Sequence, residues 1–362
     1  PRGMAIKPQN GDFFVGAYTG GFFQSSDGGA QWAFANMINT TINDLAVNPK
    51  DAQTVYAAID GLGFPLAVSN KTGQAWNYLE NSETFLNAVA VDPQVPTTIY
   101  TAKDTTTLQY SGTKAFIHKS VNNGQDWDKI AFLECVIPTC EITVQRILVS
   151  TTDSERILVA GTGDNGLLGR TINGGISWVE IGGAETSALA VDPNHADIVY
   201  AGSASLNYDF VFRYNDVWGT WSSTTLIGPD DVEKVRDIAV DQASHVYVAA
   251  SDGLYRWEEG TGATHFTNLP TDSVMAVAVD RSVSPNVVYI GTSGMGVYFS
   301  KDGGASWTAM NDGLGSLFIT NLQLSEGQPK VLYAGTLNRG VWSVMMGNGY
   351  SISIYLPMVV GE

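Results

Sequence analysis

The chain is short of charged residues, and the few that it has are mostly acidic. Only 15% of its 362 residues are charged, with 19 Lys and Arg against 36 Asp and Glu, and the formal net charge is −17. A protein with this charge repels phosphate backbones and anionic lipid head groups. We therefore expect no nucleic-acid partner.

Long apolar runs are also missing. A membrane-spanning helix needs roughly 20 consecutive apolar residues. The longest candidate, Ile352 to Val360, is much shorter and contains Pro357. An apolar stripe with the 3.6-residue period of an amphipathic helix is likewise not found at any useful length. The sequence predicts neither membrane insertion nor a helical fold.

Cysteine is limited to Cys135 and Cys140, which belong to the short segment Cys-Val-Ile-Pro-Thr-Cys. A disulfide between them would close a small ring and stabilise the fold only modestly. Because no second Cys pair or His cluster lies nearby, a tetrahedral metal site is not expected. We predict a local disulfide, with a reduced pair as the alternative, and no metal or other cofactor. This pair, scarce Lys and abundant Thr, Asn and Gly favour an extracellular or cell-surface location.

The sequence is built from repeats of roughly 45 residues. Each repeat opens with a short apolar strand that ends in a turn, and a strand rich in β-branched and aromatic residues follows. The first strands of the eight repeats begin at Met4, Leu45, Val89, Ile147, Leu189, Ile238, Val277 and Leu322. Repeated four-stranded units of this kind are typical of β-propellers. We predict an all-β single propeller of about eight four-stranded blades, with a seven-bladed ring and one diverted repeat as the alternative.

The propeller is expected to span residues 1–349, and residues 350–362 are expected to provide one further strand. Ser351 to Met358 has the pattern of the outer strand of the last repeat, where Pro357 is tolerated because an outer strand is an edge. The same segment could instead pair with an exposed strand edge of a neighbouring molecule. Another copy of the chain is therefore one expected partner.

A turn after the third strand of the repeat carries the most specific pattern, Ser-x-Asp-x-Gly-x-x-Trp. The short polar side chains accept hydrogen bonds from backbone N–H groups, Gly supplies the positive φ, and the Trp packs against the sheet. Some copies have Asn in place of Asp. The residues of this pattern are Ser25, Asp27, Gly29, Trp32, Trp76, Asn122, Trp127, Asn173, Trp178, Ser300, Asp302, Gly304 and Trp307.

With these turns and repeats, the chain resembles the Asp-box, or BNR-repeat, β-propellers. That superfamily includes bacterial sialidases, sortilin-type receptors, xyloglucanases and a photosystem assembly factor. The resemblance implies that the Asp-box residues are structural and lie opposite the usual ligand face. It implies an arginine cluster for sialidases, two tandem propellers with an acidic pair between them for xyloglucanases, and a basic patch for the assembly factor. None of these features is evident in the sequence.

Candidate binding residues lie in or just beyond the loops between second and third strands, which gather at one mouth of a propeller channel. The loops of the third to fifth repeats are the longest, so we expect the binding rim there. Carboxylates in such loops hold cations, bind sugar hydroxyls or catalyse glycoside cleavage, although Asp is also common in turns. The candidates are Asp60, Asp104, Tyr110, Asp164, Asn165, Tyr208, Asp209 and Asp252, with Trp218 as a further aromatic residue for stacking.

These features lead to two hypotheses of different kinds. The first is a secreted, non-catalytic propeller that acts as a binding or structural module at the cell surface and assembles through its C-terminal strand. Its partners would be itself, a glycan or another surface protein. The alternative is a glycan-active hydrolase or lectin that uses the rim of the third to fifth repeats. We assign no catalytic residue from the sequence, and if the chain is an enzyme, we expect a glycoside hydrolase.

Overall fold

A computed structural model describes most of the chain, including the backbone of four strands between residues 3 and 36. The described ranges beyond these strands are 41–60, 65–73, 75–79, 86–103, 114–134, 143–162, 166–182, 185–203, 211–228 and 232–346. Every regular element within these ranges is a β-strand, which confirms the all-β prediction. The described residues contain no helix with the length and apolar character needed to cross a bilayer.

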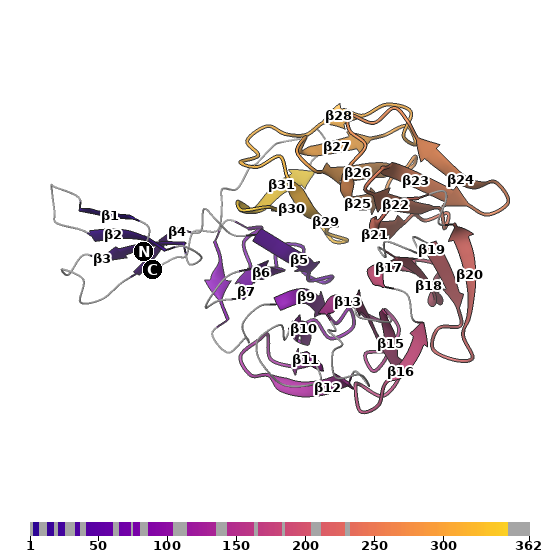
Figure 1. Ribbon diagram of the computed structural model, residues 1–362, viewed down its shortest axis with the longest axis horizontal. Helices are drawn as coiled ribbons and strands as arrows, with labels where there is room; N and C mark the ends of the chain where they lie inside the picture. The colour runs from indigo at the N-terminus through magenta and orange to yellow at the C-terminus, as the bar shows by residue number, and fades with distance from the viewer. Residues whose placement is uncertain are drawn as a thin grey trace.

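Seven antiparallel sheets are arranged in a ring as the blades of a propeller (Figure 1). Blades 1 and 2 consist of β5 (Thr41–Val47), β6 (Val55–Asp60), β7 (Leu66–Ser69) and β8 (Asn77–Tyr78), then β9 (Leu86–Val91), β10 (Ile99–Lys103), β11 (Lys114–Ser120) and β12 (Asp128–Glu134). Blades 3 and 4 consist of β13 (Thr143–Val149), β14 (Ile157–Thr162), β15 (Leu167–Thr171) and β16 (Val179–Gly182), then β17 (Thr186–Asp192), β18 (His195–Ser203), β19 (Val211–Asn215) and β20 (Ser222–Ile227).

The remaining blades follow in chain order around the ring. Blades 5 and 6 consist of β21 (Val235–Val240), β22 (Val246–Ala250), β23 (Gly253–Glu258) and β24 (Gly262–Phe266), then β25 (Val274–Asp280), β26 (Val287–Thr292), β27 (Val297–Ser300) and β28 (Thr308–Ala309). Blade 7 has β29 (Ile319–Leu324), β30 (Lys330–Thr336) and β31 (Gly340–Met346) within the described residues. The first strand of each blade lines the central channel.

The prediction of eight blades is wrong, and the alternative of seven blades with one diverted repeat is confirmed. The first repeat forms a four-stranded sheet of its own, which lies beside the ring (Figure 1). Its strands are β1 (Gly3–Ile6), β2 (Phe13–Ala17), β3 (Gly21–Ser25) and β4 (Ala33–Asn36). Similar repeats give every unit the same internal sheet, but the ring is closed by contacts between units, which a repeat does not specify.

Ring closure takes place between blade 7 and blade 1. Side chains of β5 and β6 share one apolar cluster with Val331, Tyr333 and Val341. The Tyr333 hydroxyl donates a hydrogen bond to the carbonyl oxygen of Ala52 at 2.8 Å, and the Ser343 hydroxyl donates one to the Thr72 carbonyl. Packing of apolar side chains and two buried hydrogen bonds therefore close the seven-bladed ring. The expected C-terminal strand, residues 350–362, lies outside the described residues.

The polar residue that ends each inner strand forms the turn into the second strand. Asp192 Oδ1 accepts a hydrogen bond from the backbone N–H of Asn194 at 2.9 Å, and Asp280 Oδ1 accepts one from Ser282 at 2.9 Å. Ser150 uses its hydroxyl in the same way toward Thr152. These side chains satisfy backbone donors in the turn. The recurring polar residue after the apolar anchor is thus explained by turn formation.

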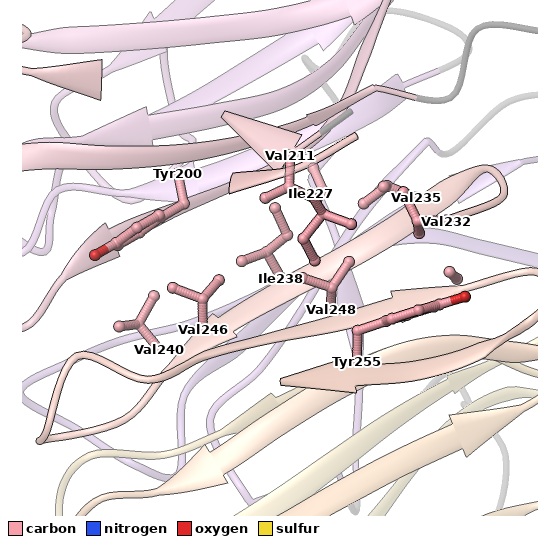
Figure 2. Packing of buried hydrophobic residues seen from close by; sticks show 12 residues of the cluster. Tyr200, Val211, Ile227, Val232, Val235, Ile238, Val240, Val246, Val248 and Tyr255 are labelled. Atoms are coloured by element: carbon pink, nitrogen blue, oxygen red, sulfur yellow. The ribbon is translucent and has the colours of Figure 1, made fainter. Parts of the chain in front are cut away.

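Neighbouring blades pack through apolar clusters that both blades contribute to (Figure 2). The cluster between blades 4 and 5 joins Tyr200 and Val211 to Val235, Ile238 and other residues of blade 5. A small residue on each second strand, opposite the third or fourth position of the inner strand, makes room for the next blade. These residues are Ala58, Ala102, Ala160, Gly202, Ala249, Gly291 and Gly335.

We expect Gly202→Ala to destabilise the ring. A Cβ atom at this position would lie 2.3 Å from Val235 Cγ1 and 2.9 Å from Val235 Cβ, across the interface between blades. Relief of such an overlap typically costs about 1–3 kcal/mol. Urea unfolding followed by tryptophan fluorescence measures the change in the free energy of unfolding.

Gly327→Ala is the matched control for this prediction. Its Cβ would meet only the Cβ of Ala52, at an ordinary 3.7 Å. The control is expected to unfold as the wild type does. Equal stability of both variants and the wild type would contradict the close packing of blades 4 and 5.

Candidate functional site

The inner strands surround a channel of about 780 Å³. Small-molecule sites in proteins usually have volumes of about 300–1,000 Å³, so the channel is large enough for a ligand. Leu, Val, Ile and Ala side chains of the inner strands make up about half of its lining residues, but most of the lining surface is polar. Polar groups gather near its two ends.

Four polar residues form a belt near the end of the channel where the inner strands begin. This polar belt consists of Asp44 on β5, Arg146 on β13, Asp237 on β21 and Asn321 on β29. A β-bulge directly before each of these residues places them at the same register of their blades. The other three blades have Ala88, Ala188 and Ala276 at this register. Polar and alanine positions therefore alternate along the chain.

The two aspartates of the belt accept hydrogen bonds from the inner strand of the following blade. Asp44 Oδ2 accepts the backbone N–H of Val89 at 3.0 Å, and Asp237 Oδ2 accepts that of Val277 at 3.0 Å. Inner strands have an unpaired edge at the channel, so these carboxylates satisfy donors that the sheets leave free. The bonds also connect blade 1 to blade 2 and blade 5 to blade 6.

Burial determines the ionisation of the belt. Desolvation raises the pKa of Asp44 to about 6, although Arg146 and two backbone hydrogen bonds act in the opposite direction. Desolvation also raises the pKa of Asp237, against the same Arg146. The Arg146 Nη1 atom lies 3.9 Å from Asp44 Oδ1, which is too long for a direct hydrogen bond. The guanidinium therefore compensates both carboxylates by charge across the channel.

Asn321 is the one belt residue with an unsatisfied buried atom. Its side chain is 6% exposed, and no group in the described part of the chain hydrogen-bonds to its Oδ1 atom. Asp44 and Asp237 each accept an N–H from the inner strand of the following blade. The equivalent donor for Asn321 would be the N–H of Leu45 on β5. The Leu45 N–H, however, interacts with Asp44 and lowers the pKa of that carboxyl group. The asparagine oxygen is thus left as a free acceptor at the channel wall.

The mouth of the channel above blades 6 and 7 has an exposed apolar patch. This mouth patch consists of Met295, Leu317, Phe318 and Leu337, which are 41–49% exposed. Backbone hydrogen bonds from Gly294 and Gly296 to the Leu317 carbonyl, and from Leu337 to the Phe318 carbonyl, hold the loops together. Next to the patch, exposed Asn338 has a positive φ of 64° and accepts a hydrogen bond from Thr41.

Asp252 is the only residue of the predicted rim whose side chain the structure describes. Its Oδ2 atom accepts the hydroxyl of Tyr255 at 2.6 Å, and its Oδ1 atom accepts the N–H of Glu233 at 3.2 Å. The Tyr255 ring stacks on His265 with ring centres 4.3 Å apart. Asp252 therefore organises the loop before β23. Asp60 ends β6, while Asp104, Tyr110, Asp164, Asn165, Tyr208 and Asp209 lie outside the described residues.

Trp218 does not provide the expected stacking surface. It is 6% exposed, packs in the cluster between blades 3 and 4, and donates its indole N–H to the Ala196 carbonyl at 3.1 Å. The disulfide predicted between Cys135 and Cys140 also falls outside the described residues. No group of three or more His, Cys, Asp and Glu residues in the described ranges is arranged to hold a metal ion.

The turns with the Ser-x-Asp-x-Gly-x-x-Trp pattern lie at the end of the ring opposite the mouth, because they follow the third strands. Ser300 Oγ accepts the N–H of Gly304 at 2.8 Å, and Asp302 Oδ1 accepts that of Ser306 at 2.9 Å. The indole N–H groups of Trp76, Trp127 and Trp178 donate to the carbonyls of Gly73, Gly124 and Gly175. The turn of blade 6 differs, because the side-chain amide of Asn268 donates a hydrogen bond to the Gly304 carbonyl. Trp307 Nε1 has no hydrogen-bond partner among the described residues. Ser25 ends β3, and Asp27, Gly29 and Trp32 lie outside the described residues.

The sequence interpretation missed the polar belt and the mouth patch. A signal for the belt was present, because Asp44, Arg146, Asp237 and Asn321 stand immediately before apolar anchors. For the mouth patch, the signal was Phe318, a large apolar residue in the loop immediately before β29. Neither pattern predicts a channel position until the seven blades are placed in a ring.

Comparison with known proteins finds a similarity between part of the chain and a protein named xyloglucanase. Over 164 residues the chain is 29% identical to this protein, from Hypocrea jecorina (strain QM6a), and the match covers 43% of this chain and 19% of that protein. The chain thus spans about a fifth of the length of this relative. No protein-family model matches the chain.

Solved structures with the same fold include enzymes and a peptide-binding protein. An ancestral GH74 enzyme aligns with a TM-score of 0.50 and 14% identity, over 96% of this chain and 60% of that chain. YCF48 bound to a D1 peptide aligns with a TM-score of 0.60 and 14% identity, over 87% of this chain and 95% of that chain. At this identity, the two structures show the fold alone. The chain is a seven-bladed β-propeller similar to the propellers of xyloglucanase-type enzymes.

These comparisons contradict the hypothesis of a non-catalytic structural module. The match to a xyloglucanase favours the alternative, a glycan-active hydrolase. The first hypothesis relied on missing catalytic motifs, but the resemblance implied that xyloglucanases place their acidic pair between two propellers. The missing motifs therefore do not exclude the alternative.

We expect the belt aspartate to make stability depend on pH. The pKa of Asp44 is about 6 in the folded chain and 3.8 as its ordinary value. Its contribution to stability is therefore fully present below pH 3.8 and is lost as the pH rises through about 6. The loss is on the order of 3 kcal/mol. Urea unfolding at several pH values should show the wild type losing stability relative to Asp44→Asn across this range.

Asp302→Asn is the control of opposite sign. Hydrogen bonds from Ser306 and Ser300 lower the pKa of Asp302 to about 2. Its contribution is present above pH 3.8 and is lost as the pH falls through about 2, so the wild type should lose stability relative to this variant on acidification. A stability difference between wild type and Asp44→Asn that does not change with pH would refute the buried, proton-binding state of Asp44.

Proposed function

We propose that this chain is a propeller of a glycoside hydrolase that acts on xyloglucan or a closely related branched β-glucan, and that it binds the glycan at its channel mouth. The observation that carries the proposal is the 29% identity to a xyloglucanase over 164 residues. The seven-bladed ring is consistent with it. Because propellers also host unrelated functions, the similarity in sequence counts for more than the fold.

The mouth patch supports glycan binding. Phe318 is 49% exposed at the end of the channel where propeller loops usually bind ligands. An exposed aromatic ring is a suitable surface for the apolar face of a sugar. Exposed Asn338 and Arg339 lie beside it and provide polar groups for hydroxyls. We therefore propose that the rim includes loops of blades 6 and 7, in addition to the loops of the third to fifth repeats expected from the sequence.

We assign the catalytic pair of carboxyl groups to none of the residues that the structure describes. Glycoside hydrolysis requires two carboxyl groups on either side of the scissile bond. Asp252, the described carboxylate of the predicted rim, is engaged in its own loop. We also propose that the four described turns with the Ser-x-Asp-x-Gly-x-x-Trp pattern are Asp-boxes. The proposed location of the protein is the extracellular space, where polysaccharide substrates of this size are found.

The proposal is tested by binding and hydrolysis. Calorimetry measures binding of xyloglucan oligosaccharides to the chain, with unbranched cello-oligosaccharides for comparison, and a reducing-end assay measures cleavage of xyloglucan. We expect binding of the branched oligosaccharides and release of reducing ends. A chain that neither binds nor cleaves xyloglucan would exclude this function.

We expect Phe318→Ala to weaken oligosaccharide binding about fivefold. Loss of one aromatic stacking surface is worth on the order of 1 kcal/mol, and 1.4 kcal/mol corresponds to a factor of ten in affinity. Calorimetric titration of wild type and variant with the same oligosaccharide gives the two dissociation constants.

Ile176→Ala is the control for Phe318→Ala. Ile176 is 88% exposed in the turn between β15 and β16, at the opposite end of the ring. The substitution removes exposed apolar surface but does not alter the mouth patch, so the variant should bind the oligosaccharide with the affinity of the wild type. An equal loss of affinity in both variants would argue against a binding role of the mouth patch.

A further inference from the structure

The polar belt lies inside the channel, and the proposed function assigns it no role. Its four residues come from blades 1, 3, 5 and 7 and face a cavity of about 780 Å³. The mouth patch, by contrast, lies in the loop before β29 and in the loops between the second and third strands of blades 6 and 7. The belt is thus a separate set of groups, deeper in the molecule and far less exposed.

The belt offers a fixed mixture of hydrogen-bond acceptors and donors. Asp44 and Asp237 have carboxylate oxygens, Asn321 has an amide, and the guanidinium of Arg146 has five N–H donors. One of these donors binds the Gln145 carbonyl at 2.9 Å. Backbone hydrogen bonds hold both carboxylates in place. Groups fixed in this way lose little entropy when a ligand binds.

The free oxygen of Asn321 indicates that the belt is more than a link between blades. A buried acceptor without a partner costs about 1–3 kcal/mol. The structural bonds of the belt are complete at Asp44 and Asp237, but Asn321 Oδ1 has no donor within the described residues. A donor that enters from the channel would remove this cost.

The charges of the belt favour a neutral ligand with several hydroxyl groups. Arg146 repels a cation from the space between the carboxylates, and the carboxylates repel an anion. A hydroxyl group donates to Asn321 or an aspartate and also accepts from Arg146, so it suits both kinds of group. A sugar ring presents several hydroxyls at once and is smaller than the cavity.

We infer that the polar belt is an internal subsite that holds one sugar ring of the glycan within the channel. The inference rests on the proposed function for the identity of the glycan, but the subsite itself is defined by Asp44, Arg146, Asp237 and Asn321. Hydroxyl groups of the ring donate to the Asn321 oxygen and the two carboxylates and accept from Arg146. The mouth patch then holds the part of the chain that remains outside.

Binding of free monosaccharides tests the subsite independently of the polysaccharide. D-glucose and D-xylose are titrated against the chain and followed by saturation-transfer NMR. The test variants are Asn321→Leu, which keeps the side-chain size, and Asn321→Ala, which serves if the leucine does not fit. Ile176→Ala is the control because Ile176 lies at the opposite end of the ring and the substitution leaves both the belt and the mouth patch intact. Urea unfolding establishes that each variant is folded.

We expect the wild type and Ile176→Ala to bind at least one of the two sugars with the same affinity. Both Asn321 variants should lose about tenfold or more, since each loses a buried hydrogen bond. Absence of monosaccharide binding to the wild type would overturn the inference. Equal affinity in the wild type and a folded Asn321 variant would also overturn it.

The outcomes separate this inference from the proposed function. If xyloglucan oligosaccharides do not bind but a monosaccharide binds with dependence on Asn321, the proposed function fails and the sugar subsite stands. If oligosaccharides bind with dependence on Phe318 while monosaccharides do not bind, the subsite fails and the proposed function stands.

Discussion

The packing of each inner strand against the second strand of the preceding blade is the interaction on which the structure depends. A small residue on the second strand allows this approach. A Cβ atom added at Gly202, Gly291 or Gly335 would lie less than 3.0 Å from Val235, Ile319 or Ile42, respectively. The third of these contacts closes the ring. The channel exists because seven such contacts bring the inner strands around a common axis, and every candidate binding group takes its position from them.

The strands and turns of the blades could be predicted from the sequence because they are local features. The anchor Leu189-Ala-Val-Asp192 contains both the apolar strand and the residue that forms the turn after it. Blade number is different, because β1 to β4 form a sheet as regular as the others but lie outside the ring. Nothing in the internal pattern of a repeat distinguishes a unit in the ring from a unit beside it.

The candidate site was less predictable for the same reason. Asp252 was expected from its position in a loop, but its bond to Tyr255 depends on the pairing of β23 with its neighbours. Trp218 was expected at the surface, but it is buried between blades. Successive belt residues are 84 to 102 positions apart along the chain, and only the bulges at the same register bring them to one level of the channel. Functional groups that depend on contacts between repeats cannot be read from one repeat.

The number of blades has a consequence for the belt that follows from parity. Polar and alanine positions alternate from Asp44 through Ala276, and a ring with an even number of blades could continue this alternation without a break. Seven is odd, so two polar positions must become neighbours at one place. That place is the seam where blade 7 meets blade 1, and it brings Asn321 beside Asp44. The unsatisfied acceptor in the channel is therefore a product of ring closure with an odd number of units.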